Sequence, residues 1–493
     1  MKNKYILSLD QGTTSSRAIL FNEKGQSIGK AQKEFKQIFP KPSWVEHDPN
    51  EIWDSQFETA KKAISESKVN IEEIAGIGIT NQRETIVAFD SMTGKPVYNA
   101  IVWQCRRTAE YCNELKSKYK KLIKEKTGLE IDAYFSASKM RWILDHVPEA
   151  KELIKSKRLR FGTIDSWLIW NLTKGKSFFT DTSNASRTML FNISTGKYDS
   201  ELLTIFNIEE WMLPEIISSN GDFGYTDESI LGKRIPIKGV LGDQQAALFG
   251  QCCFKEGDLK VTYGTGGFLL INTGNKLQFN ENFLTTIAWK FKNNDSFTYA
   301  LEGSTFISGA AIQWLRDSLE IIKDSSETEK IAISINGNDG VYFVPAFVGL
   351  GSPYWDQKAR GAIFGITRRT TKAHFVRAAV ESMAYQIADL VLPIKNLLSK
   401  DTFLKADGGA AKNDFLLQFQ ADLLGMSVTR SKQTEATALG VAYLAGLNLG
   451  IWDSTEEIQK NYKTDELFLP KANREDEYKM WKEAVKRSLD WEK

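Results

Sequence analysis

Near the middle of the chain, residues 239–270 read GVLGDQQAALFGQCCFKEGDLKVTYGTGGFLL. The run from Gln245 to Cys253 is rich in alanine and leucine and predicts a buried helix, and Asp243 precedes it in a polar loop. A strand is expected over Leu259–Tyr263, followed by the glycine turn Gly264–Gly267 and a second apolar run. Such a turn exposes backbone N–H groups in a concave array that suits phosphate oxygens. The stretch therefore predicts a lone carboxylate, a bridging helix and an anion site.

A second copy of this strand–turn–strand arrangement lies at the front of the chain. Lys4–Leu9 predicts a strand, Asp10–Ser16 (DQGTTSS) predicts a turn rich in hydroxyl groups, and Arg17–Phe21 predicts the returning strand. A single short glycine turn usually does no more than reverse the chain. Two such turns about half a chain apart instead indicate duplicated domains that face one nucleotide.

A third glycine turn lies near the C-terminal end of the sequence. Thr402–Ala406 predicts a strand, Asp407–Ala411 (DGGAA) breaks it, and Lys412–Leu424 predicts a helix. The open backbone of the turn and the dipole of the helix N-terminus both favour an anion. This segment is therefore a further candidate for contact with a nucleotide.

The length of the chain predicts more than one domain. At 493 residues it is too long for one core, and 42% hydrophobic with 26% charged residues is ordinary for a globular protein. We expect two α/β domains, one over residues 1–250 and one over residues 251–493, with a boundary near Gly250 beside the predicted central helix.

Composition also excludes several classes of function. A net charge of +2 argues against nucleic acid as the main partner, and no apolar run approaches the roughly 20 residues of a membrane span. The four cysteines lack paired zinc spacing and suit a reducing compartment. The first residues are unlike a signal peptide because Asp10 interrupts a short apolar run. These features together predict a cytoplasmic location.

Between the first two glycine turns, Asn81–Thr85 (NQRET) follows a predicted strand, Ile74–Thr80. Arg83 and Glu84 would offer donors and acceptors to a ligand with several hydroxyl groups, although an exposed ion pair is the commoner explanation of such neighbours. Further along, Thr180–Phe191 is rich in hydroxyls and amides and is expected to be a polar loop near the site.

Several segments together resemble the FGGY carbohydrate kinases, and within that group the enzymes that phosphorylate glycerol. The resemblance runs from Asp10 to about Gly450 and is most specific in DQGTTSSRA, NQRET, IVWQCRRTAEYC, SNASRTMLFN, GDQQAALFG, TYGTGGF and DGGAAKN. It implies the RNase H-like fold of actin and hexokinase, present twice, with the catalytic cleft between the two domains. The implied reaction is ATP-dependent phosphorylation of glycerol to sn-glycerol 3-phosphate.

The resemblance also implies a role for individual residues. Those that would hold the hydroxyl groups of glycerol are Arg83, Glu84, Tyr134, Asp243 and Gln244, and those that would sandwich its carbon atoms are Trp103 and Phe268. Those that would contact ATP are Thr13, Thr14, Ser15 and Arg17 in the first turn, Thr265 in the second, and Gly309, Gln313, Gly409 and Asn413 around the nucleoside.

For catalysis, the resemblance implies that Asp10 positions Mg²⁺ through its water shell. Asp243 would be the general base and a second candidate contact for the metal. The expected partners are glycerol and ATP, with neither nucleic acid nor membrane insertion, and a homodimer or homotetramer is expected.

Three alternatives stay open at this point. A kinase of the same group could act on xylulose, ribulose or gluconate, although Arg83, Glu84 and Trp103 favour glycerol. The fold could also serve a protein that senses or hydrolyses ATP without a small substrate, as in actin-like proteins and chaperones. A pseudokinase is disfavoured because Asp10 and Asp243 are both present.

Overall fold

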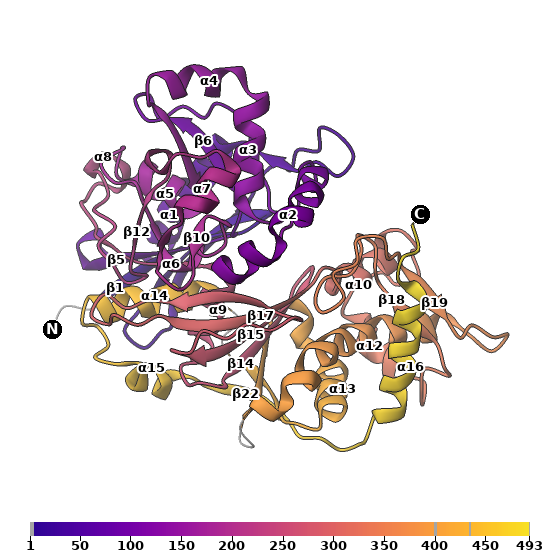
Figure 1. Ribbon diagram of the computed structural model, residues 1–493. Helices are drawn as coiled ribbons and strands as arrows, with labels where there is room; N and C mark the ends of the chain where they lie inside the picture. The colour runs from indigo at the N-terminus through magenta and orange to yellow at the C-terminus, as the bar shows by residue number, and fades with distance from the viewer. Residues whose placement is uncertain (1–3, 399–401, 433–434, 493) are drawn as a thin grey trace.

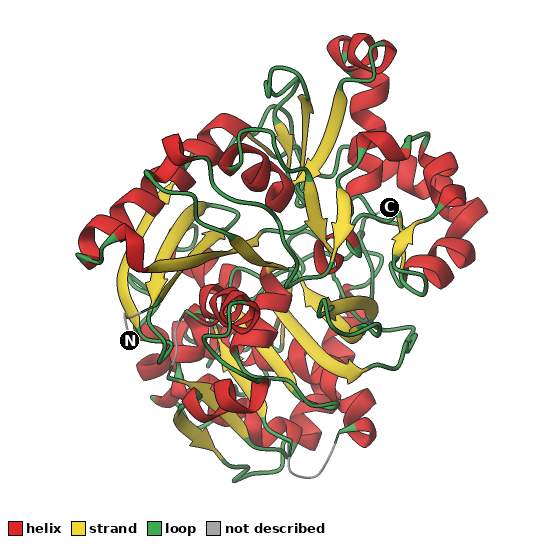
Figure 2. Cartoon of the chain, turned by 90° about the vertical axis from the view of Figure 1, so that its left-hand side faces the viewer, coloured by secondary structure: helices red, strands yellow, loops and turns green. Residues whose placement is uncertain are grey.

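The computed structural model describes residues 4–398, 402–432 and 435–492. The chain forms two α/β parts with a junction between them (Figure 1). Residues up to Gly250 are called the N-terminal half below, and those that follow are called the C-terminal half. Strands run through the middle of each part with helices packed around them (Figure 2).

The sheet of the N-terminal half has the order β13-β5-β1-β2-β3. Its first three strands, β1 (Tyr5–Gln11), β2 (Ser15–Phe21) and β3 (Ser27–Glu34), form an antiparallel meander. Strands β5 (Ile74–Asn81) and β13 (Ile237–Gly242) then continue it in parallel with β1. The first predicted strand–turn–strand unit is confirmed as β1 and β2.

The sheet of the C-terminal half repeats this plan. Its order is β16-β17-β15-β14-β20-β21-β22, in which β14 and β15 form the second strand–turn–strand unit, as predicted, and β20 and β21 run parallel to β14. The strands are β14 (Leu259–Tyr263), β15 (Gly267–Gly274), β16 (Leu284–Trp289), β17 (Thr298–Thr305), β20 (Leu404–Asp407), β21 (Val428–Ser431) and β22 (Thr464–Phe468). Both sheets therefore have the same inner order: a three-stranded antiparallel unit extended by two parallel strands.

Alternation along the strands explains how the layers stack. In β1, Leu7 and Leu9 face a core shared with α1 (Pro49–Ser67) and α5 (Ile164–Leu172), whereas Ile6 faces the opposite side. That opposite side is covered by α9 (Asp243–Gly250) and α14 (Ala436–Asn448), which also pack against Leu270 and Ala300 of the second sheet. The two helices thus form a layer between the sheets, although α14 comes from the far end of the chain (Figure 1).

Helices α9 and α14 cross at a pair of glycines. A methyl group on Gly440 would lie 1.9 Å from the backbone oxygen of Ala246, and one on Gly250 would lie 1.9 Å from that of Ala436. Both contacts are far inside van der Waals distance and involve backbone atoms that cannot move aside. Only glycine therefore permits this close approach of the two backbones.

The remaining elements surround these layers. A four-stranded sheet of order β4-β7-β6-β8 lies within the N-terminal half. The other strands are β4 (Glu46–His47), β6 (Ile86–Asp90), β7 (Ala100–Ile101), β8 (Leu159–Thr163), β9 (Phe179–Asp181), β10 (Phe191–Asn192), β11 (Lys197–Tyr198), β12 (Glu215–Ile217), β18 (Tyr342–Val344) and β19 (Ala362–Phe364). The other helices are α2 (Ala109–Thr127), α3 (Ser136–His146), α4 (Pro148–Lys155), α6 (Thr182–Ala185), α7 (Ser200–Phe206), α8 (Glu228–Leu231), α10 (Gly309–Asp317), α11 (Glu327–Ile333), α12 (Lys372–Val391), α13 (Asp414–Leu424), α15 (Thr455–Asn461) and α16 (Glu475–Ser488). In the part of the chain that the structure describes, every helix is too short or too polar to cross a bilayer.

One local prediction is wrong. The segment Thr180–Phe191 is a buried strand end and helix rather than a polar loop, because the Asp181 side chain caps α6 by accepting from the backbone N–H groups of Ser183 and Asn184.

We expect Gly440→Ala to destabilise the protein by about 1–3 kcal/mol, since the added methyl group forces the two helices apart. The midpoint of urea unfolding, followed by circular dichroism, measures this change. Gly337→Ala is the control, because the nearest atom to its added methyl group is 3.9 Å away. Equal midpoints for the two variants would show that the crossing tolerates separation.

Candidate active site

The ends of parallel strands bring the predicted site residues together. Gln11, at the end of β1, pairs with Asn81 of β5, which in turn pairs with Gly242 of β13. The residues around these three ends, including Arg83 and Asp243, therefore meet at one edge of the first sheet. In the second sheet, Thr262 of β14 pairs with Asp407 of β20, so the other two glycine turns meet in the same way.

A cavity of about 450 Å³ opens between the halves. Its walls come from both halves, and six of the seven residues predicted to hold glycerol line it. The lining residues are Thr13, Thr14, Arg83, Glu84, Trp103, Gln104, Tyr134, Asp243, Thr265, Gly266, Phe268 and Gln313. We call this space the polyol cavity.

Aromatic rings form part of the wall of the polyol cavity. The ring of Trp103 lies 6.5 Å from that of Phe268 at an angle of 76°, and 5.5 Å from that of Tyr134. The indole N–H of Trp103 donates to the hydroxyl oxygen of Thr13 at 2.9 Å. This hydrogen bond joins Trp103, in the aromatic wall, to the first glycine turn, which is the candidate phosphate-binding site.

Asp243 is the first residue of α9 and projects into the polyol cavity with 32% of its side chain exposed. Its Oδ1 forms an ion pair with Nε of Arg83 at 3.1 Å and accepts a hydrogen bond from the backbone N–H of Gln244 at 2.8 Å. Oδ2 accepts from the Gln244 side chain at 3.2 Å. The carboxylate is therefore oriented on one side by fixed donors and open to a ligand on the other.

Behind Asp243 lies a buried cluster of four charged side chains. Glu302 of β17 accepts from Nη1 and Nη2 of Arg83 at 2.5 and 3.0 Å, and from Arg187 at 3.0 Å. Arg187 also donates to Glu84 at 2.6 Å. Burial alone would raise the pKa of Glu302, but Arg187 and Arg83 outweigh it and lower the pKa to about 2. Because the four side chains are at most 2% exposed, Arg83 and Glu84 are not an exposed surface pair.

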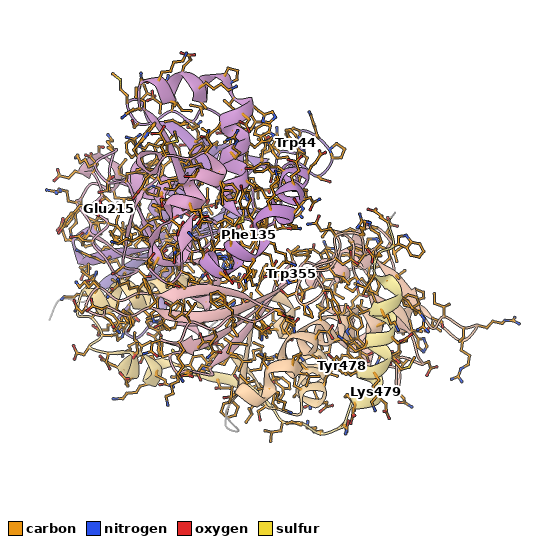
Figure 3. The ribbon with its side chains drawn as sticks, in the orientation of Figure 1. Trp44, Phe135, Glu215, Trp355, Tyr478 and Lys479 are labelled. Carbon is orange, nitrogen blue, oxygen red and sulfur yellow. The ribbon has the colours of Figure 1, made fainter. Side chains whose placement is uncertain are left out.

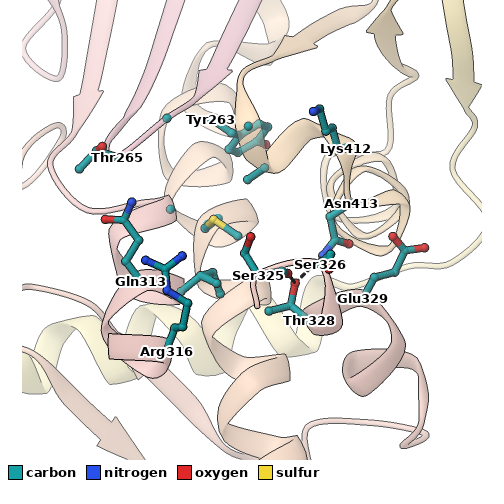
Figure 4. Close-up of a pocket in the computed structure, with 16 residues that line it drawn as sticks. Tyr263, Thr265, Gln313, Arg316, Ser325, Ser326, Thr328, Glu329, Lys412 and Asn413 are labelled. Carbon is teal, nitrogen blue, oxygen red and sulfur yellow. Dashed lines mark hydrogen bonds between the residues drawn. The ribbon is translucent and has the colours of Figure 1, made fainter. Parts of the chain in front are cut away.

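A second cavity of about 460 Å³ lies in the C-terminal half (Figure 4). Gln313 and Arg316 lie on one side of it, with Lys412 and Asn413 on the other. The other lining residues are Tyr263, Gly264, Thr265, Gly309, Ile312, Ser325, Ser326, Thr328, Glu329, Met383, Gly409 and Ala410. Thr265 and Gln313 also line the polyol cavity, so the two cavities adjoin at these residues.

The second glycine turn lies where the two cavities meet, and hydrogen bonds hold it in place there. The N–H of Gly264 donates to the oxygen of Gly266, and the first residues of α10 donate back to the turn, Gly309 to Gly264 at 2.9 Å and Ser308 to Thr265 at 2.8 Å. Across the cavity, the Asn413 side chain caps α13 and donates to Thr328 at 3.2 Å. These hydrogen bonds tie the turn to the start of α10, and Asn413 to α11.

Three predicted nucleotide or metal residues lie outside the lining of both cavities. Arg17 contacts Glu435 at 2.6 Å and Asp10 at 3.9 Å. Burial raises the pKa of Asp10 to about 6, although Arg17 opposes this shift. Ser15 accepts a hydrogen bond from Gln32 at 3.0 Å. Arg17 therefore serves as an ion-pair partner here, and the structure gives it no direct contact with either cavity.

The donor set around Asp10 and Asp243 fits a Mg²⁺ ion that a nucleotide brings with it. Among the described residues no group of three histidine, cysteine, aspartate or glutamate side chains is close enough to hold a metal ion directly. Mg²⁺ keeps several water ligands and is commonly bound by one or two carboxylates and by substrate phosphates. A carboxylate at the end of β1 and another at the end of β13 match that requirement.

Some residues of the site carried no signal in the sequence. Gln104, next to Trp103, lines the polyol cavity. Buried Lys260 donates to the side chains of Gln244 at 2.6 Å and Thr262 at 2.9 Å, which explains why Gln244 contacts Asp243 without lining the cavity itself. Burial also lowers the pKa of Lys260. A lysine within a predicted strand has no feature that would reveal this role.

We expect Glu302→Gln to cost about 3–5 kcal/mol of stability, because it leaves two buried guanidinium groups without a full counter-charge. Urea unfolding measures the loss. Glu152→Gln is the control, since its partner Lys155 and Glu152 itself are both more than 70% exposed. A Glu302→Gln midpoint equal to that of the control would show that the cluster contributes no net stability.

Comparison with known proteins agrees with this geometry. The models of the N-terminal and C-terminal domains of the FGGY family of carbohydrate kinases match residues 5–250 and 259–449. Glycerol kinase 2 of Thermotoga maritima is 57% identical over 99% of this chain and 100% of its own length, and the glycerol kinase of Caldanaerobacter subterraneus is 56% identical over 99% of each.

A solved structure shows the same arrangement. Plasmodium falciparum glycerol kinase with ADP superposes with a TM-score of 0.91 at 40% identity, over 99% of this chain and 98% of that one. A gluconate kinase from Lactobacillus acidophilus shares the fold at 23% identity. The predicted two-domain α/β fold of the actin and hexokinase type is confirmed. The chain belongs to the FGGY family of carbohydrate kinases.

Proposed function

We propose that this protein transfers the γ-phosphoryl group of ATP to glycerol, giving sn-glycerol 3-phosphate and ADP. The observation that carries the proposal is the position of Asp243 in a cavity that adjoins a second one at Thr265 and Gln313. An alcohol in the first cavity and a triphosphate reaching from the second would meet at that junction. Relatives more than 55% identical over nearly the whole chain are glycerol kinases, which supports glycerol as the alcohol.

In this proposal the nucleoside occupies the second cavity between α10 and α13. Gly309, Gln313, Gly409 and Asn413 surround it, and Thr265 meets the phosphates. From the other half, Thr13 and Thr14 reach the same phosphates by way of the polyol cavity. Ser15 and Arg17 would act from behind this turn, Arg17 through its contact with Asp10.

Glycerol would fit the polyol cavity because its two kinds of surface have different partners there. Its hydroxyl groups need donors and acceptors, which Arg83, Glu84 and Asp243 supply, with Gln244 and Tyr134 beside them. Its C–H faces need an apolar wall, which Trp103 and Phe268 provide. A hydroxyl bound at the open side of Asp243 would lie in the cavity that adjoins the nucleoside cavity at Thr265 and Gln313.

The chemistry then needs positioning and charge neutralisation more than covalent catalysis. Asp243 accepts the proton of the terminal hydroxyl, and the oxygen attacks the γ-phosphorus as the bond to ADP breaks. Arg83 keeps the Asp243 carboxylate oriented for this transfer. Mg²⁺, which Asp10 would hold through water with Asp243 nearby, would neutralise charge on the phosphates when bound.

Further parts of the proposal concern the chain as a whole. They are the division into domains at residues 1–250 and 251–493, the requirement for Mg²⁺, a cytoplasmic location and assembly as a homodimer or homotetramer. Size-exclusion chromatography with light scattering would test the assembly, and titration with a chelator would test the metal.

For Asp243→Asn we expect kcat to fall by roughly 10²–10⁴-fold, because the amide cannot accept the proton. A coupled assay of ADP release measures the rate. Asp295→Asn, a change at an exposed loop position, is the matched control and should keep the full rate. Undiminished turnover by folded Asp243→Asn would remove Asp243 from the role of general base.

A panel of alcohols tests the substrate. We expect glycerol to give the highest kcat/KM among glycerol, glyceraldehyde, dihydroxyacetone and xylulose, because the polyol cavity presents polar groups around a three-carbon chain. The same coupled assay serves for each. Preference for xylulose would assign the protein to the pentulose kinases of the family, and ATP hydrolysis with no preference would favour a nucleotide sensor.

A further inference from the structure

The carboxylate of Asp132 joins three segments of the chain. It accepts from Nη1 and Nη2 of Arg106 at 2.6 and 3.1 Å, from the backbone N–H of Tyr134 at 2.8 Å, and from the side-chain amide of Gln357 at 2.8 Å. Its side chain is 7% exposed. Arg106 and Tyr134 belong to the N-terminal half, whereas Gln357 comes from the C-terminal half, so the carboxylate spans the junction.

Both N-terminal segments that meet at Asp132 also carry walls of the polyol cavity. Trp103 and Gln104 lie three and two residues before Arg106, and Tyr134 lies two residues after Asp132. The rings of Trp103 and Tyr134 are in edge contact. A shift of Asp132 would therefore move the aromatic wall, although Asp132 itself does not line the cavity.

Gln357 belongs to a segment, residues 349–360, that we call the clasp. The clasp is anchored to the rest of its own half by the N–H of Ser352, which donates to the oxygen of Ser304 at 2.9 Å, and by the Tyr354 hydroxyl, which donates to Asp389 at 2.8 Å. The N–H of Asp490 also donates to Asp356 at 2.8 Å. These three hydrogen bonds hold the clasp against the rest of the C-terminal half.

Two side chains of the clasp, those of Trp355 and Gln357, reach the N-terminal half. Trp355 packs against the apolar cluster of that half, which includes Ala133 and Phe135, the neighbours of Tyr134. Figure 3 places Trp355 at the junction, with Phe135 labelled on the other side of it. Trp355 thus supplies apolar contact across the halves, and Gln357 supplies a directional hydrogen bond beside it.

We propose that Gln357 is a positioning residue for the polyol: its hydrogen bond to Asp132, made across the junction of the two halves, holds the Tyr134 and Trp103 wall in place. The charge of Asp132 is already balanced by Arg106, so the amide of Gln357 is not needed for neutralisation. Its contribution is therefore directional, fixing where the Asp132 carboxylate lies relative to the C-terminal half. This inference rests on the proposed use of the cavity for glycerol.

The test is the kinetics of Gln357→Met, which keeps the length of the side chain and removes the donor. We expect KM for glycerol to rise roughly 3- to 10-fold, the effect of one lost hydrogen bond, with KM for ATP unchanged. Gln357→Glu should raise KM for glycerol further, because its carboxylate would face that of Asp132. Lys358→Ala is the control, since this exposed neighbour makes its hydrogen bonds through its backbone N–H and oxygen, which alanine keeps.

Hydrogen exchange gives a readout that a merely structural role would not change. We expect glycerol to slow exchange in residues 349–360 of the wild-type protein and to lose this effect in Gln357→Met. An unchanged KM, an equal rise for ATP, or equal protection in both proteins would overturn the inference. Failure of the wild-type protein to phosphorylate glycerol would instead overturn the proposed function, so the two failures are distinguishable.

Discussion

The ion-pair cluster around Glu302 determines how the two halves meet at the polyol cavity. The C-terminal half provides Glu302, and the N-terminal half provides Arg83 and Arg187, which both donate to it. Taking these groups out of water costs several kcal/mol for each ion, and only close pairing offsets that cost. Since Nε of Arg83 also forms an ion pair with Asp243 at 3.1 Å, the orientation of the proposed base depends on the same arginine. The geometry of the site is therefore a property of the joined halves, and neither half has it alone.

Local patterns predicted the parts of the fold that local physics controls. Two glycine turns between short strands, at residues 12–14 and 264–266, were enough to predict two similar sheets, because glycine positions and alternation report directly on turns and strands. The family resemblance then predicted the residues around the cavities, and most of them do line one. Thr180–Phe191 was mispredicted because its polar groups bond to one another and to the chain, which lets a hydroxyl-rich segment be buried.

What sequence could not reveal depends on contacts between distant residues. Arg83 and Glu302 are 219 residues apart, and Arg187 and Glu302 are 115 apart, so neither pair leaves a periodic or spaced signal. For the same reason the neighbours Arg83 and Glu84 were compatible with an exposed ion pair until their distant partners were known. Lys260 and Asp132 are further cases, since each acts by supporting a residue that the resemblance had already assigned.

Helix α14 has a consequence for how the protein is made. It covers the face of the first sheet that carries Ile6 and Ile19, and the hydroxyl of Ser8 donates to the backbone oxygen of Ala438, 430 residues away. At about 5–20 residues per second, a ribosome needs on the order of tens of seconds to travel from one to the other. During that interval the nascent N-terminal half exposes the part of this apolar face that α14 covers in the finished protein. Chain order thus leaves the half that emerges first incompletely covered until α14 has been made.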